Sequence, residues 1–501
     1  MSAAPPTDGT DQGDIAALAK GGRTNMLGFL LRLAARIPFL FIAGRLYGAE
    51  ALGIFAYALV VIELTALVCS LGEKRGLAQR LTESEANPSN LVFDAILMTV
   101  LMSIIPMVIF WLLPILVYPN GNYSDIDKLL VLAIPGYALT EIVLAAQAYR
   151  YDIATTVRAR AVVEPWTISI MAGVFFYVGW IRDSGLTMAY LVSIYAGLAV
   201  GLWSFLRTYG LPKNWRPHPV YMGKMVWRAL PLAIADAVEW GTRRIDVLIL
   251  GWFAGPAAVG IYWVAQQVAS LPQKLKTSFE PILSPVITKN LKTKNYGAIA
   301  QQVSQVGFWI IAAQAGIALA LGIPGEGVMG LVGPNFVGGT GALAFLLVAE
   351  VVAATAVVSE AVLVYVARVR NLWISISAIA LQAALTVGLI MLVEDMGFGE
   401  PFKAAGAALA LALALAAASL VKAWLLSRFL GHRVNNWRWA LIWAAGPAVV
   451  VGFAATFLPE WAELLFGIPA ILFTYGWIIW HKGFGPEDRV LFRKNLSKPE
   501  D

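Results

Sequence analysis

The chain carries the stretch GRLYGAEALGIF at residues 44–55 and a related stretch, GWFAGPAAVGIY, at residues 251–262. The three glycines and the isoleucine after the third recur at a constant shift of 207 positions, and the same shift places Arg36 on Arg243. Each copy lies where one long apolar segment ends and the next begins. Membrane proteins built from two similar halves typically work by moving one half against the other around a central site. The repeat therefore predicts a transporter.

The composition predicts a membrane protein over nearly the whole length. Of 501 residues, 59% are hydrophobic and 14% are charged, with a mean hydropathy of +0.71, whereas a soluble domain carries roughly 25% charged residues. Apolar runs of about 20 residues recur, as membrane-spanning helices require. We expect an all-α polytopic fold of about fourteen transmembrane helices. The predicted spans are 24–45, 52–72, 92–117, 129–149, 161–180, 186–206, 227–252, 256–279, 298–322, 340–366, 372–393, 404–427, 438–458 and 463–481.

The basic residues set the predicted orientation. Of the 37 Lys and Arg residues, only Arg45, Lys128, Arg182 and Lys403 lie outside, five lie within spans and the other 28 fall on the inner side. Basic loops stay in the cytoplasm, so an even number of spans places both termini there. The net charge of +6 is therefore read as topology and contact with membrane lipids, and nucleic acid is not an expected partner.

The spans divide into two lobes and an extra pair. We predict a disordered cytoplasmic tail at 1–23, an N-lobe at 24–206, a basic cytoplasmic connector at 207–226 and a C-lobe at 227–427. The extra helices lie at 438–481 and a cytoplasmic tail at 482–501. Six helices separate the two glycine stretches, which makes the lobes parallel repeats. The outer loops are too short for the external domain that a glycan polymerase or glycosyltransferase needs.

Arginines within the first span suggest a site for an anion. Arg32 and Arg36 are four residues apart, on one helical face. Burying an arginine near the bilayer centre costs about 2.5–3.5 kcal/mol, so such residues face a water-filled cavity, an anion or a carboxylate. Glu63 in the second span lies at a similar depth. Two readings stay open and are compatible: an Arg36–Glu63 ion pair, and a cationic cavity for an anionic ligand.

The seventh span is rich in charge. It carries Asp236, Glu239, Arg243, Arg244 and Asp246. Spacings of three and four residues allow some of these charges to neutralise one another within the helix. We interpret Arg243 and Arg244 as substrate-binding candidates, and the three acidic residues, with Glu63, as candidates for ion pairs or for coupling to a proton or sodium ion.

Arg150 and Lys274 are weaker candidates for the inner mouth of the site. No other cofactor or metal is expected, because the sequence holds no phosphate-binding G-x4-G-K-[ST] loop, no H-E-x-x-H and only one cysteine. The three histidines, His218, His432 and His481, fall in inner loops or at an inner helix end. We therefore expect a carrier and not an enzyme.

The glycine stretches give the chain a family resemblance. The pattern G-x3-G-x4-G-[IV]-[FY] at 44–55 recurs within residues 245–262, followed by Pro281 and Pro285. Together with fourteen spans in two lobes and an extra pair, this resembles the polysaccharide transporter branch of the multidrug/oligosaccharidyl-lipid/polysaccharide exporter superfamily, the Wzx-type flippases. The resemblance covers essentially the whole chain.

The resemblance implies a substrate and a location. The substrate would be an undecaprenyl-pyrophosphate-linked oligosaccharide, moved by alternating access across the bacterial inner membrane. A polysaccharide polymerase and export machinery would be partners. Arginine suits phosphate oxygens, so the arginines named above would hold the pyrophosphate or acidic sugars in an interlobe cavity. A lipid II flippase and a cation-coupled drug exporter of the same superfamily remain alternatives.

Overall fold

The structure is a computed structural model that describes residues 37–83, 87–217, 219–241, 244–277, 287, 290–485 and 488, and all regular elements over these residues are helical. Within this part of the chain, ten helices are long and apolar enough to cross a membrane. The predicted all-α polytopic class is thereby confirmed. The ten are Ile37–Cys69, Pro88–Leu112, Asp127–Tyr149, Ile153–Phe176, Arg182–Tyr209, Tyr296–Gly322, Pro334–Val366, Arg368–Asp395, Glu400–Leu430 and Glu460–Gly483, and a shorter apolar helix is Ala440–Ala455.

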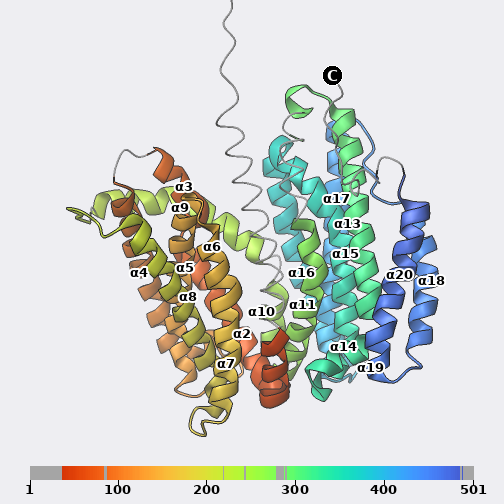
Figure 1. The fold of residues 1–501 in the computed structure, drawn as a ribbon, viewed down its shortest axis with the longest axis horizontal. Helices are drawn as coiled ribbons and strands as arrows, with labels where there is room; N and C mark the ends of the chain where they lie inside the picture. Colours follow the sequence, from red (N-terminus) through yellow and green to blue (C-terminus); the bar gives the residue numbers. More distant parts are fainter. Residues whose placement is uncertain are drawn as a thin grey trace, which may run out of the picture. The chain divides into compact units, whose positions relative to one another are not determined.

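The chain forms two compact units, which meet in the sequence between Arg244 and Ile245. The main helices of unit 1 are α2 (Gly48–Cys69), α3 (Glu73–Glu83), α4 (Pro88–Leu112), α5 (Ala133–Tyr149), α6 (Ile153–Val157), α7 (Glu164–Phe176), α8 (Gly185–Tyr209) and α9 (Pro219–Gly241). In Figure 1 their colours run from red through yellow to light green. A buried apolar cluster joins α3, α4, α5 and α8, with Leu77, Ile142 and Phe205 fully enclosed. This cluster and the packing of α2, α7 and α8 against their neighbours give unit 1 a core of its own.

Unit 2 is built around three long helices. Its elements are α10 (Ile245–Phe253), α11 (Pro256–Thr277), α13 (Tyr296–Gly322), α14 (Gly325–Val332), α15 (Thr340–Val366), α16 (Arg368–Asp395), α17 (Glu400–Leu430), α18 (Ala440–Ala455), α19 (Glu460–Ala462) and α20 (Ile468–Ile478). The green to light-blue helices α13, α15 and α17 lie side by side in Figure 1, and α20 and α18 follow in darker blue. Within the Ala–Leu run of α17, Ala410 and Ala414 are almost fully buried. Their small side chains allow the close approach of α15 and α17.

The two glycine stretches both break a helix. In unit 1, a π-helical turn at Ala43–Tyr47 ends at Gly48, whose φ of +81° is a left-handed conformation that glycine adopts without strain. In unit 2, Ala254 and Gly255 separate α10 from α11, and the Gly255 N–H donates to Glu400 at 2.8 Å. The predicted placement of the repeat between consecutive helices is confirmed in unit 2. In unit 1 the stretch lies within the apolar helix Ile37–Cys69, which the turn at Gly48 interrupts.

Most predicted spans coincide with helices to within a few residues, and α15 has the predicted ends. The seventh span differs. α9 ends at Gly241 and α10 begins at Ile245 after a turn at Arg244, within the span predicted as a single helix at 227–252; residues 242–243 lie outside the described residues. By its contacts, α9 packs on α2 and α3 within unit 1, although residues 227–241 belong to the predicted C-lobe. The count of fourteen spans and the six-plus-six division stay predictions.

Within unit 2, a buried carboxylate connects the segment after α20 to α13 and to the segment before α18. Asp488, only 2% exposed, accepts hydrogen bonds from Gln305 Nε2 (3.0 Å), Trp309 Nε1 (2.8 Å), Arg438 Nη1 (2.6 Å) and the Gly485 N–H (2.9 Å). Burial opposes ionisation, but these bonds outweigh it and lower the pKa of Asp488 to about 2. Because Arg438 directly precedes α18 and Asp488 follows α20, the contact anchors this helix pair to α13.

Candidate functional site

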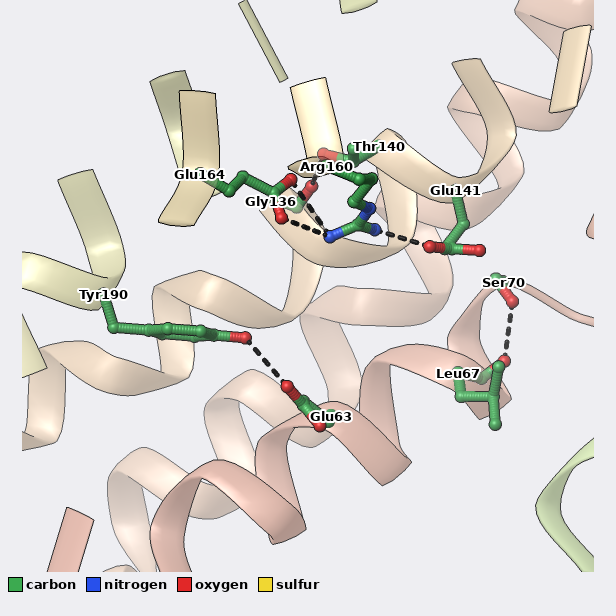
Figure 2. A network of polar contacts seen from close by, with 9 residues as sticks. All are labelled: Glu63, Leu67, Ser70, Gly136, Thr140, Glu141, Arg160, Glu164 and Tyr190. Carbon is green, nitrogen blue, oxygen red and sulfur yellow. Dashed lines mark hydrogen bonds and ion pairs between the residues drawn. The ribbon is translucent and has the colours of Figure 1, made fainter. Parts of the chain in front are cut away.

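An arginine side chain lies between two carboxylates inside unit 1. Arg160 Nη1 donates to both carboxylate oxygens of Glu164, at 3.0 and 2.9 Å, and its Nη2 donates to Glu141 Oε1 at 2.5 Å, as Figure 2 shows. The three side chains are only 12–15% exposed. Ionisable residues within membrane helices are costly and usually functional. The pairing neutralises the buried arginine and makes this arrangement the candidate site of unit 1.

Arg160 is positioned by a capped and locally widened helix. Asp152 caps the start of α6, because its carboxylate accepts the Thr155 N–H at 3.1 Å and the Thr155 hydroxyl at 2.6 Å. The helix then passes through a π-helical turn, Arg158–Val163, into α7. Such turns are rare and occur frequently at functional sites. The turn carries Arg160, and Glu164 follows it as the first residue of α7.

Tyrosines and a third carboxylate complete the cluster. The Arg160 guanidinium lies 4.6 Å from the centroid of the Tyr137 ring, which precedes Glu141 by one turn of α5. On the adjoining helices, the Tyr190 hydroxyl of α8 donates to Glu63 Oε1 of α2 at 3.5 Å, next to the arginine in Figure 2. We call this set the Arg160 cluster: Glu63, Tyr137, Glu141, Arg160, Glu164 and Tyr190. It brings together one guanidinium from the π-helical turn, three carboxylates from α2, α5 and α7, and two tyrosines from α5 and α8.

The Glu164 carboxylate needs a glycine on the neighbouring helix. A Cβ atom on Gly197 of α8 would lie 2.4 Å from Glu164 Oε1 and 2.6 Å from its Cγ. We expect Gly197→Ala to push Glu164 away from Arg160 and to lower the unfolding free energy by about 1–3 kcal/mol, the usual cost of overpacking. Thermal unfolding of the purified protein in detergent measures this.

Gly173 on α7 provides the matched control. A Cβ atom there would meet no atom within 4 Å. Alanine in a helix is favoured over glycine by roughly 0.5–1 kcal/mol, so Gly173→Ala should leave stability unchanged or raise it. If Gly197→Ala and Gly173→Ala unfold at the same midpoint temperature, Glu164 can move without loss of stability. That result would contradict a fixed position of the Glu164 carboxylate.

Several residues predicted for the substrate site cannot be placed. Arg32, Arg36 and Arg243 lie outside the described residues, and so do the side chains of Glu239 and Lys274. Their roles, and the Arg36–Glu63 ion pair, stay predictions.

The other predicted site residues occupy three different settings. Arg150 is exposed at the end of α5, with its guanidinium 5.3 Å from the Tyr209 ring centroid. Asp236 on α9 and Arg244 before α10 are partly buried and both take part in polar or electrostatic contacts. Asp246, at the start of α10, is fully buried and accepts a hydrogen bond from the Tyr262 hydroxyl. The tyrosine that ends the second glycine stretch thus holds the Asp246 carboxylate.

The sequence prediction missed Arg160 because the fifth span was predicted to begin at residue 161. The structure starts this helical segment at Ile153, which moves Arg160 inside it. A signal was present in the sequence: Arg160 and Glu164 are four residues apart and within reach of each other on a helix. The contact with Glu141, nineteen residues earlier, carries no such local signal.

Comparison with known sequences shows the family to which the chain belongs. Residues 18–290, more than half of the chain, match the sequence family described as polysaccharide biosynthesis protein. No curated protein matches its sequence.

Solved structures with similar folds include a lipid flippase and MATE proteins. The lipid II flippase MurJ in an inward closed conformation gives a TM-score of 0.71 at 12% identity, over 95% of this chain and 100% of that one. A multidrug resistance MATE family transporter of the MOP superfamily, in an inward-facing conformation, gives 0.65 at 14% identity, over 81% of this chain and 94% of that one. A MATE structure in the straight conformation gives 0.54 at 13% identity, over 83% and 96%. At these identities the comparison establishes a common fold.

Proposed function

Because the chain belongs to the polysaccharide biosynthesis protein family, we propose that it is a flippase for an undecaprenyl-pyrophosphate-linked oligosaccharide repeat unit. It moves this lipid from the inner to the outer leaflet of the bacterial cytoplasmic membrane by alternating access, with both termini in the cytoplasm. The family match is the observation that carries the proposal. The fold shared with a lipid-linked glycan flippase and with MATE transporters supports it.

The proposed substrate has a charged head, and the proposed site matches that charge. Arg32, Arg36, Arg243 and Arg244 supply guanidinium groups for the pyrophosphate, with Arg150 and Lys274 at the inner mouth. Guanidinium groups bind phosphate oxygens through paired, charge-assisted hydrogen bonds. The lipid tail remains among membrane lipids, and a polysaccharide polymerase with its export machinery receives the product.

Energy coupling is proposed to pass through acidic residues. The Arg160 cluster places Glu63, Glu141 and Glu164 in a mostly buried setting in which protonation or sodium binding would change the local charge balance. Asp236 and Glu239, near the end of unit 1, and Asp246, at the start of unit 2, are the further candidates. A rate of lipid transfer that is independent of pH and sodium would exclude both ions.

Two related functions compete with this proposal. A lipid II flippase is favoured by the fold shared with MurJ over 95% of the chain. A cation-coupled drug exporter is favoured by the MATE likeness and by the carboxylates of the Arg160 cluster. Separate transfer assays with lipid II and with a soluble organic cation discriminate between them.

We expect the purified protein in liposomes to accelerate the leaflet exchange of a fluorescent undecaprenyl-pyrophosphate glycan over protein-free vesicles. Arg36→Ala and Arg243→Ala are expected to abolish this acceleration while leaving expression intact, because each removes a proposed phosphate ligand. The measurement is the fraction of probe accessible to a membrane-impermeant quencher over time.

One control variant and two contradicting outcomes make the assay decisive. Arg182→Gln removes an exposed guanidinium that lies over the Phe176 ring, 4.2 Å from its centroid, and should leave exchange unchanged. Full exchange in both Arg36→Ala and Arg243→Ala would contradict the role of these arginines. No exchange of any glycan lipid, together with transport of a soluble cation, would replace the flippase proposal by drug export.

A further inference from the structure

Unit 2 contains a lysine that is buried within the long helix α17. Lys422 is 5% exposed. Its Nζ donates to Glu360 Oε2 of α15 at 3.0 Å and to Ser375 Oγ of α16 at 3.1 Å. A buried ammonium group in a membrane helix is costly without such partners and by default marks a functional site. None of the residues assigned above to substrate binding belongs to this cluster.

The carboxylate of Glu360 is held by donors from two other helices. Its second oxygen, Oε1, accepts a hydrogen bond from Asn371 Nδ2 of α16 at 3.3 Å. The donors Lys422 and Asn371 therefore each take one oxygen of the same carboxylate. Together they form a cradle that fits a carboxylate, because a carboxylate occupies it. The Ser375 hydroxyl oxygen accepts from Lys422 Nζ and so orients the ammonium group.

Exposure indicates that this carboxylate can leave the cradle. The side chain of Glu360 is 43% exposed, whereas that of Lys422 is 6% exposed. Glu360 lies six residues before the end of α15, about 9 Å along the helix axis. An exposed carboxylate within a membrane helix faces water rather than lipid tails. Glu360 therefore lies between Lys422 and water, and a water-soluble ligand must displace Glu360 to reach Lys422.

The cradle also contains an acceptor without a partner. Asn371 is 6% exposed, and among the described residues its Oδ1 has no hydrogen-bond partner. The amide must present Nδ2 to Glu360, because a carboxylate only accepts, so Oδ1 remains free for a donor. Buried acceptors are normally satisfied. A ligand that fits this cradle thus brings a carboxylate for Lys422 and a hydroxyl donor for Asn371.

We propose that Lys422, Ser375 and Asn371 form a binding site for the carboxylate of an acidic sugar, and that Glu360 occupies this site when no such sugar is bound. A uronic acid offers the carboxylate and neighbouring hydroxyl groups. Pyrophosphate offers oxygens that mainly accept, so it leaves Asn371 Oδ1 unsatisfied. The inference rests on the proposed function, because the acidic sugar would be part of the translocated oligosaccharide.

Binding to the purified full-length protein in detergent tests the site directly. We expect sodium glucuronate to bind more tightly than glucose in isothermal titration calorimetry. Pyrophosphate is proposed to bind at the arginines named above, so Lys422→Gln should leave its binding unchanged. Lys422→Gln should weaken glucuronate binding at least about tenfold, because it removes a charge-assisted hydrogen bond. Lys403→Gln is the matched control, since Lys403 lies near the other end of α17 and pairs with Glu394 and Glu400. Equal binding of glucuronate and glucose, or undiminished binding by Lys422→Gln, would overturn the proposal.

Two further variants test the displaced carboxylate and the free acceptor. Glu360→Gln removes the competing charge and should tighten glucuronate binding about tenfold. Asn371→Leu keeps the Lys422–Glu360 pair and should reduce glucuronate binding to the level of acetate, which has no hydroxyl group. If Glu360→Gln does not fold, Asn371→Leu alone decides: an unchanged preference for glucuronate over acetate contradicts the proposed contact.

Leaflet exchange separates this inference from the proposed function. Two fluorescent undecaprenyl-pyrophosphate glycans are compared, one neutral and one with a glucuronate residue. Slower exchange of the acidic glycan alone in Lys422→Gln supports the site. If Lys422→Gln slows the exchange of both glycans equally, the acidic-sugar site is contradicted, but the proposed flippase function is not. Exchange of neither glycan by the unaltered protein contradicts the proposed function, and the glucuronate titration then judges the site by itself.

Discussion

Replacing Arg160 by glutamine is expected to lower the unfolding free energy by about 3–5 kcal/mol, the usual cost of removing one partner from a buried ion pair. The guanidinium bridges the two carboxylates: Arg160 Nη1 lies 2.9 Å from Glu164 Oε2, and Nη2 lies 2.5 Å from Glu141 Oε1. Without it, two mostly buried carboxylates lose their shared counter-charge. We also expect leaflet exchange to be lost, because α5 and the segment leading into α7 are no longer joined at this point. Thermal unfolding in detergent and the liposome assay measure the two effects.

Compensating changes distinguish a charge effect from a packing effect. Adding Glu141→Gln and Glu164→Gln to Arg160→Gln removes the charges that the arginine neutralised, so stability should partly return. Arg160→Lys keeps the charge but not the planar fork, and one ammonium should serve two carboxylates less well. Arg182→Gln, at an exposed arginine of unit 1, should change little. If Arg160→Gln unfolds at the same temperature as Arg182→Gln, the cluster does not stabilise unit 1.

The sequence predicted helix positions well where hydropathy changes sharply. Residues 340–366 form one apolar run bounded by glycines on one side and basic residues on the other, and α15 has these ends. The same criterion misplaced Arg160, because it treats a charged residue at a helix end as outside the membrane. Whether such a residue lies within the helix depends on its partners, and Glu141 belongs to another helix.

Tertiary pairing also explains why the Lys422 cluster could not be predicted. Lys422 is one of the five basic residues within predicted spans, but Glu360 and Ser375 are 62 and 47 residues away in the sequence. No periodicity links positions on three different helices. By contrast, the sequence alone identifies the repeated glycines. The positive φ at Gly48 favours glycine over other residues, so this backbone conformation is visible in the residue type itself.

Asp488→Ala is expected to lower the stability of the α18–α20 region by about 1–3 kcal/mol, the usual cost of leaving hydrogen-bond donors without an acceptor. Arg438 loses its carboxylate, but its side chain is 37% exposed, so solvent screens much of that loss. The loss extends to Gln305 and Trp309 of α13, whose donors both point at Asp488 Oδ1. Arg438 retains its contact with the Gly483 carbonyl and its position over Phe308. Hydrogen exchange should therefore accelerate in α18 and α20, and much less in α15 and α17.

The pH dependence of this contact has a definite sign. The pKa of Asp488 is about 2 in the folded protein and roughly 3.9 in an unfolded chain. A lowered folded-state pKa means that the stabilisation is complete above about pH 4 and is lost as the pH falls toward 2. The stability difference between the unaltered protein and Asp488→Asn should thus be constant from pH 7 to about 4 and shrink below it. Asp395→Asn, at an exposed position, is the control variant for the measurement. A difference that already shrinks between pH 7 and 5 would mean that Asp488 is not held by Arg438, and that the helix pair docks on α13 through its apolar contacts alone.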